Sequence, residues 1–447
     1  MTIFRHARML VLALAALLAL AACSPGEEPE AEDSPPPTPD ETEPAEPEEA
    51  DSELPADDLR LTLEQQLGAH ASLAINAMRN GLAGAEEFEE SAAILERNTT
   101  DLTSSIELVY GAEGADAFEQ MWSEHIGFFV QYTQGLAADD QAMQDEALAQ
   151  LEQYRQDFGD FIETASEGNI PGDAVAEGLQ VHVDQLVEQI DAYDQQDFAT
   201  AYRLERDAYA HMFETAQALA GGIAAQFPDR FPSDAHDQVS LGGHAATVRP
   251  VQAEEQVAAI DLQSLLGQQL GEHALLAQSA MRKGFAGAPD FDESAAALDG
   301  NTQNLTDSIE LVYGAEGADA FEQMWSDHIG FFVDYTVGLA GGDEQQRDEA
   351  LAQLEQYRQD FSDFIDEASE GNIPGDAVAD ALQVHVDQLV GQIDAYAQDN
   401  FEDSYLQTYE AYNHMFETAA AFAGGITEQF PQRFLGSPSA GMGHAES

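Results

Sequence analysis

Residues Ser105–Ser123 have the sequence SIELVYGAEGADAFEQMWS, and the same 19 residues recur at Ser308–Ser326, 203 positions further along the chain. The repetition extends to both sides of this stretch. Residues 61–231 align with residues 264–434 without a gap, and 121 of the 171 aligned positions are identical. Similarity at one fixed offset indicates a structural unit that occurs twice. The sequence therefore predicts two homologous domains in a chain of 447 residues.

Apolar residues within the repeat recur with helical spacing, and no stretch alternates with the two-residue period of a strand. In the second copy this pattern, interrupted by Gly and Pro, predicts six helices at about 260–284, 290–312, 315–338, 343–369, 375–396 and 399–428. Short connections favour antiparallel neighbours. We therefore expect an all-α fold with two homologous six-helix bundles, each made of three helical hairpins.

Acidic residues dominate the composition: the chain has 85 of them against 15 basic residues, which gives a formal net charge of −70. The only lysine is Lys283. Because nucleic-acid binding needs clustered Lys and Arg, we expect no nucleic-acid partner. Acidic residues spread over folded domains keep a protein soluble where salt screens their repulsion. The composition therefore indicates a halophilic or salt-tolerant bacterial source.

The N-terminus has the pattern of an export signal. Arg5 and Arg8 precede an apolar run from Met9 to Leu20, which is too short for a membrane span of roughly 20 residues. The run ends at Leu20-Ala21-Ala22-Cys23, which resembles the lipobox of bacterial lipoproteins. This resemblance implies cleavage before Cys23, lipidation of its thiol and a lipid anchor in the cell membrane, with the protein extracytoplasmic. An ordinary signal peptide with an incidental cysteine is the alternative.

The segment that follows has the composition of a disordered tether. Residues 24–58 contain 15 acidic residues, nine prolines and no basic residue, so they cannot bury enough apolar surface to fold. The predicted organisation is a signal peptide at 1–22, an acidic tether at 23–58, bundles at 59–231 and 259–434, a linker at 232–258 and a tail at 435–447.

Histidines and methionines recur at matching positions of the two copies. Eight of the 12 histidines lie in the repeats, namely His70, His125, His182 and His211, then His273, His328, His385 and His414. The first three of the second copy fall on apolar helix faces, at a common depth of roughly 15–20 Å from one end of the bundle. The fourth, His414, is expected at about the same depth on another helix. Met121 and Met324 precede His125 and His328 by one turn, so the pattern predicts one His/Met cluster per bundle.

Imidazole and thioether together favour copper, because soft sulfur suits Cu(I) and imidazole suits Cu(II) or zinc. Zinc is therefore one alternative, and haem held without a covalent link by His and Met is another. The sequence has no Glu-x-x-His pair of a carboxylate-bridged di-iron site, no His-Glu-x-x-His and no Cys-x-x-Cys-His. No nucleophile motif or paired acid and base is recognisable either. We therefore expect a binding protein and not an enzyme.

Three stretches of the second copy carry a resemblance to known domains: GEHALLA at 271–277, WSDHIGFFVDYT at 325–336 and HVDQL at 385–389. They resemble secreted helical domains of Gram-positive bacteria that occur in proteins labelled copper-amine-oxidase-like. The resemblance covers both copies. It implies an extracytoplasmic helical module with recurring histidines and leaves the chemistry open.

Two functions of different classes follow from these observations. The first is binding or buffering of a transition metal, copper in first place, by one His/Met cluster in each bundle. The second is a structural or interaction module of the cell envelope, in which the histidines are packed core residues and the bundle surface binds another envelope protein. Convergence of the four imidazole nitrogens of a bundle within about 5 Å would favour the first function, and their dispersal the second.

Overall fold

The computed structural model of the chain describes residues 55–231, 257–436 and 438–439. The predicted signal peptide with Cys23, almost all of the predicted tether and residues 232–256 of the predicted linker lie outside the described residues. The described part of the chain forms ten helices and two strands of two residues each. The predicted all-α fold is therefore confirmed.

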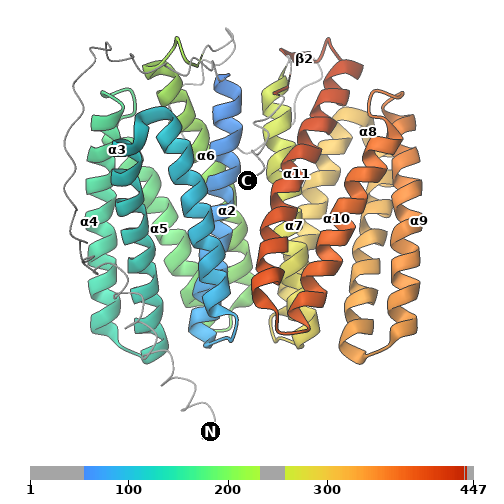
Figure 1. Ribbon diagram of the computed structural model, residues 1–447, viewed down its shortest axis with the longest axis horizontal. Coiled ribbons are helices and arrows are strands. Elements are labelled where there is room, and N and C mark those ends of the chain that lie inside the picture. The colour runs from blue at the N-terminus through green and yellow to red at the C-terminus, as the bar shows by residue number, and fades with distance from the viewer. Residues whose placement is uncertain (1–54, 232–256, 437, 440–447) are drawn as a thin grey trace, which may run out of the picture.

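Each copy of the repeat forms one bundle of helices that run alternately up and down, and the two bundles stand side by side (Figure 1). Each helix packs against the next one in the sequence, and the last helix of each bundle closes it against the first. The helices of the first bundle are α2 (Ala56–Ala83), α3 (Phe88–Ala138), α4 (Gln141–Ala165), α5 (Gly172–Asp194) and α6 (Phe198–Gln226). Those of the second are α7 (Ala259–Ala286), α8 (Phe291–Gly341), α9 (Glu344–Ala368), α10 (Gly375–Tyr396) and α11 (Phe401–Gln429).

Helices α3 and α8 each consist of two helical segments joined at a glycine. Gly111 has φ 75° and ψ 173°, and Gly314 has φ 76° and ψ 175°, a conformation that is accessible almost only to glycine. The chain reverses direction there, so the two halves of each helix lie antiparallel (Figure 1). Each bundle thus has six helical segments, and the predicted break between 290–312 and 315–338 falls at Gly314.

The first helix begins at Ala56, within the stretch predicted as tether. Pro55 precedes it. Proline fits the start of a helix, because its fixed φ is compatible with this position and a backbone N–H would have no partner within the helix there. Asp57 and Asp58 lie in the first turn, and acidic residues are favoured at this end of a helix because of its dipole. Local start signals therefore extend the helix into the acidic segment.

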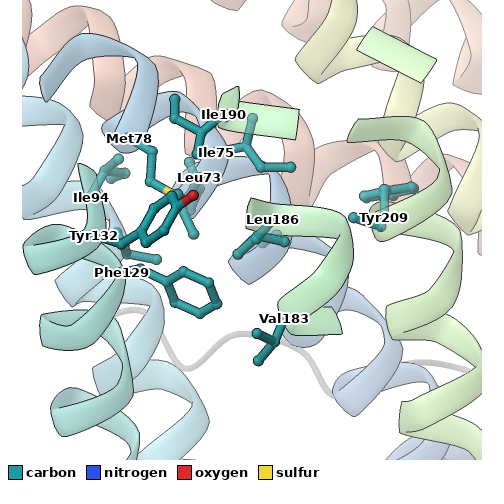
Figure 2. Packing of buried hydrophobic residues seen from close by; sticks show 14 of the residues in the cluster. Leu73, Ile75, Met78, Ile94, Phe129, Tyr132, Val183, Leu186, Ile190 and Tyr209 are labelled. Atoms are coloured by element: carbon teal, nitrogen blue, oxygen red, sulfur yellow. The ribbon is translucent and has the colours of Figure 1, made fainter. Parts of the chain in front are cut away.

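Apolar side chains of α2, α3 and α5 converge between these helices and form part of the first-bundle core (Figure 2). Leu186 and Ile190 of α5 are fully buried there, and Phe129 of α3 is almost so. Full burial of one such side chain stabilises the fold by about 1.5–3 kcal/mol. The same cluster continues into the second bundle through Tyr405 and Tyr409 of α11, so the two bundles share a core.

The bundles dock through α2, α3 and α6 of the first against α7, α8 and α11 of the second. The contact is pseudo-symmetric. The Tyr193 hydroxyl donates a hydrogen bond of 2.9 Å to Asp290, and its counterpart Tyr396 donates one of 2.9 Å to Glu87, the counterpart of Asp290. A pair of equivalent contacts is the mark of an isologous interface. Two ion pairs add to it, Arg60–Asp261 and Arg206–Glu272.

A short parallel strand pair joins the chain segments that precede and follow the helices of the second bundle. It consists of β1 (Val257–Ala258) and β2 (Phe434–Leu435). Leu435 is the first residue of the predicted tail. Within the described ranges, none of the helices combines the length and the apolar character that a membrane crossing requires.

Candidate metal centre

Three histidines of each bundle converge in its core from three different helices. In the first bundle they are His70 of α2, His125 of the second half of α3 and His182 of α5. One ligand nitrogen from each lies within 4.8 Å of the other two. The three helical segments run in the same direction, so residues at equal depth fall in one layer. The second bundle repeats the arrangement with His273, His328 and His385.

The nitrogens of the first cluster have the spacing of metal ligands. His70 Nε2 and His125 Nε2 are 3.4 Å apart. Two imidazole nitrogens at the usual distance from one tetrahedral metal ion are separated by about 3.3–3.4 Å. The third nitrogen, from His182, lies within 4.8 Å of both, which a small side-chain rotation can shorten. The residues therefore fit a three-histidine site in which one further position is left for another ligand.

Aromatic side chains hold the imidazoles in place. The Trp122 ring lies 4.7 Å, between centroids, from both His70 and His125. Tyr154 stacks on His125 at 4.9 Å with an angle of 14° between the planes. Trp325 and Tyr357 repeat these contacts in the second bundle. The spacing of Trp122 and His125, three residues apart on one helix face, was visible in the sequence, but nothing there linked Tyr154 to them.

Burial keeps the imidazoles neutral. The side chains of this group are at most 4% exposed. Burial lowers the pKa of His125 and of His182 to about 3, and it lowers the pKa of His328 to about 3 as well. The pKa of His70 is also well below its usual value, first because of burial and then because of the neighbouring imidazoles. Neutral imidazole is the form that binds metal ions, so no proton has to leave at pH 7.

Polar atoms around the cluster are short of hydrogen bonds. Both ring nitrogens of His182 and of His273 have no hydrogen-bond partner among the described residues. The same is true of Trp122 Nε1 and the Tyr154 hydroxyl within that part of the chain. A buried polar group without a partner costs about 1–3 kcal/mol, and folded proteins contain few of them. A metal ion that takes the imidazole lone pairs would offset this cost.

The fourth histidine of each copy lies outside these groups of three. His211 Nε2 is 3.0 Å from the carbonyl oxygen of Gly178, and His414 Nε2 is 3.0 Å from that of Ala381. A ring nitrogen that donates to a carbonyl is not available to a metal ion. In this arrangement Nε2 of both residues is engaged, and the structure brings together three of the four predicted histidines in each bundle. That His211 and His414 are also ligands stays a prediction.

A cavity beside each cluster is lined by a methionine. This methionine is Met212 in the first bundle and Met415 in the second. Each follows a histidine directly in the sequence, at 211 and 414, which is the only signal that pointed to it. Met121 and Met324 are half-buried and are not among the residues that line the cavities in the described part of the chain. Their role as thioether ligands stays a prediction.

Comparisons with known proteins found no match for this chain: no family model, no curated protein and no solved structure is significantly similar to it.

Proposed function

We propose that each bundle binds one transition-metal ion through its three buried histidines, and that the protein binds or buffers this metal. The observation that carries the proposal is the convergence, in both bundles, of three neutral imidazoles whose nitrogens lie within 4.8 Å of one another. Their number and type match the three-histidine sites that bind copper or zinc in other proteins. No catalytic group is required by this function.

The contacts support metal binding over a purely structural role. A core histidine that only packs is expected to hydrogen-bond to a hydroxyl, a carbonyl or a carboxylate. His211 and His414 do this through backbone carbonyls. The converging histidines differ. His70 Nε2 and His125 Nε2 lie 3.4 Å from each other, and both ring nitrogens of His182 have no hydrogen-bond partner among the described residues.

Copper is the first candidate among the metals. Imidazole sites follow the order of affinity in which Cu²⁺ exceeds Zn²⁺. The thioether of Met415 lines the same cavity as His328 and His385, and sulfur favours Cu(I). Haem is less well supported in the second bundle, because the cavity beside His328 has a volume of about 30 Å³, which is room for one or two water molecules.

We further propose that the protein performs this function outside the cytoplasm, anchored by a lipid on Cys23. The support is the sequence pattern at 20–23, which lies outside the described residues. An envelope protein partner remains an alternative role for the bundle surface, and it does not depend on the histidines.

The experiment is elemental analysis of the purified protein after equilibration with Cu²⁺ or Zn²⁺. The buffer contains about 1 M salt, so that ions attracted only by the net charge of −70 are displaced. We expect about two equivalents of one metal to stay bound. His125→Ala should remove one equivalent, and His125→Ala with His328→Ala should remove both.

His211→Ala and His414→Ala are the matched controls, because these histidines lie next to the clusters and bond to carbonyls. They should retain both equivalents. Helix content measured by circular dichroism must stay unchanged in every variant. Wild-type protein that retains no metal under these conditions would rule out the proposal.

A further inference from the structure

The cavities beside the two clusters differ greatly in size, although the bundles are close copies. The cavity beside His328 and His385 is small, about 30 Å³. The cavity beside His125 and His182 is part of a space of about 1800 Å³. This space continues past the kink of α3 and along α6 to residues of α7. Among the described residues, the first cluster therefore borders a large continuous space, whereas the second borders a small one.

The two cavities are built from equivalent positions. Eleven of the twelve residues that line the small cavity have a counterpart that lines the large one. Only two of these eleven positions differ in residue type. Gly178 of α5 is replaced by Ala381, and Leu219 of α6 is replaced by Phe422. Both replacements put a larger side chain in the second bundle.

These two positions lie where they can narrow the space. Gly178 is one turn before His182 on α5, and Leu219 is two turns after His211 on α6, so they face the gap between these helices. A methyl group at Gly178 would have no atom within 4 Å among the described residues, so the space beside it is open. In the second bundle the methyl group of Ala381 and the ring of Phe422 occupy the equivalent positions and line the cavity that remains.

We propose that residues 178 and 219, with their counterparts 381 and 422, determine access to the two clusters. The first cluster exchanges small ligands readily with the surroundings. The second cluster exchanges them only when the bundle opens locally, and such opening costs free energy. Together with the proposed metal function, this makes the first bundle an exchange site and the second a retention site.

Access is tested first without metal. The protein is treated with diethyl pyrocarbonate, a small reagent that acylates neutral imidazole, and the modified peptides are followed by mass spectrometry. Glu124 and Asp327 give the peptides of His125 and His328 different masses, so the two bundles can be distinguished. We expect His125 and His182 to react at least about ten-fold faster than His328 and His385. Equal rates would overturn the proposal.

Exchanging the two side chains between the copies tests which residues are responsible. Gly178→Ala with Leu219→Phe should slow the first cluster to the rate of the second. Ala381→Gly with Phe422→Leu should speed up the second cluster at least about ten-fold. The matched control is Glu177→Asp. It introduces the residue type that the second copy has at this exposed position next to Gly178, and it should change neither rate. Swapped variants that fold and keep the wild-type rates would also overturn the proposal.

Release of bound metal to a chelator provides a second readout. Two phases of equal size are expected, and the Gly178→Ala, Leu219→Phe variant should lose the fast phase. If both metals leave in one phase and the imidazoles react equally, the access proposal fails while the metal function stands. If no metal binds, the metal function fails, and the modification rates alone decide whether access differs.

Discussion

Acidification of the metal-free protein from pH 7 to pH 5 is expected to unfold it. Six imidazoles are buried in the two clusters, and burial lowers the pKa of all of them, for example to about 3 for His182. In the unfolded chain the same groups have the ordinary histidine pKa of about 6.5. The unfolded state therefore binds more protons between these two values.

The sign of the effect follows from this difference. A group with a lowered pKa in the folded state contributes its stability above the unfolded pKa, and this contribution is lost as the pH falls toward the folded pKa. Each histidine costs about 1.4 kcal/mol for every pH unit below 6.5, so six cost about 8 kcal/mol per unit. A folded domain has about 5–15 kcal/mol in total. Asp58, Glu64 and Asp191 act in the opposite direction, because burial raises the pKa of these carboxyls, but they are three groups against six.

The measurement is helix content against pH by circular dichroism, in about 1 M salt and with a chelator present. We expect the midpoint of unfolding between about pH 5 and pH 6. His182→Leu with His385→Leu removes two of the six groups and should make the loss of stability with pH about one third less steep. A wild-type protein that stays fully folded at pH 4 would show that the imidazoles gain protons without unfolding.

Replacing His182 by leucine is expected to leave the metal-free protein as stable as before, or to make it more stable. Both ring nitrogens of His182 have no partner within the described ranges, and the side chain is buried. Leucine has a similar volume and no polar atom. Removing the unpaired nitrogens should raise the free energy of unfolding at pH 7 by up to about 1–3 kcal/mol. The same variant should lose the metal of the first bundle.

Leu186→Ala is the matched control, because Leu186 lies one turn further along α5 and is fully buried. Urea titration at pH 7 measures the free energy of unfolding of both variants, and Leu186→Ala should lower it by about 2–5 kcal/mol. A comparable loss in His182→Leu would contradict the account, since it would show that the imidazole itself stabilises the core. A residue that binds metal at the expense of stability is the pattern expected of a functional site.

Much of the fold could be predicted from the sequence, because helical spacing is a local feature and the gapless repeat shows that the same unit occurs twice. The break in α8 is an example, since Gly314 sits between two helical patterns and only glycine adopts its backbone conformation readily. The common depth of His273, His328 and His385 could also be predicted from helix rise. Their convergence follows once the three helices run in the same direction.

Other features depend on contacts between distant segments, which spacing along a helix does not encode. His211 is not part of the cluster, and its ring bonds instead to the carbonyl oxygen of Gly178 on the neighbouring helix. The docking of the bundles relies on pairs such as Tyr193 and Asp290, whose partners lie in different copies. The different access to the two clusters depends on two small changes among many identical positions, and only their place beside a cavity gives them meaning.

The most direct test of the central claim is X-ray absorption spectroscopy at the metal edge of protein loaded with copper or zinc and washed in high salt. We expect about three imidazole nitrogens per metal at about 2.0–2.1 Å, with the scattering pattern of the imidazole ring. The signal should fall by half in His125→Ala and disappear in the double variant with His328→Ala. A shell of oxygen atoms alone would contradict the account, because it would place the metal on the acidic surface and not at the histidines.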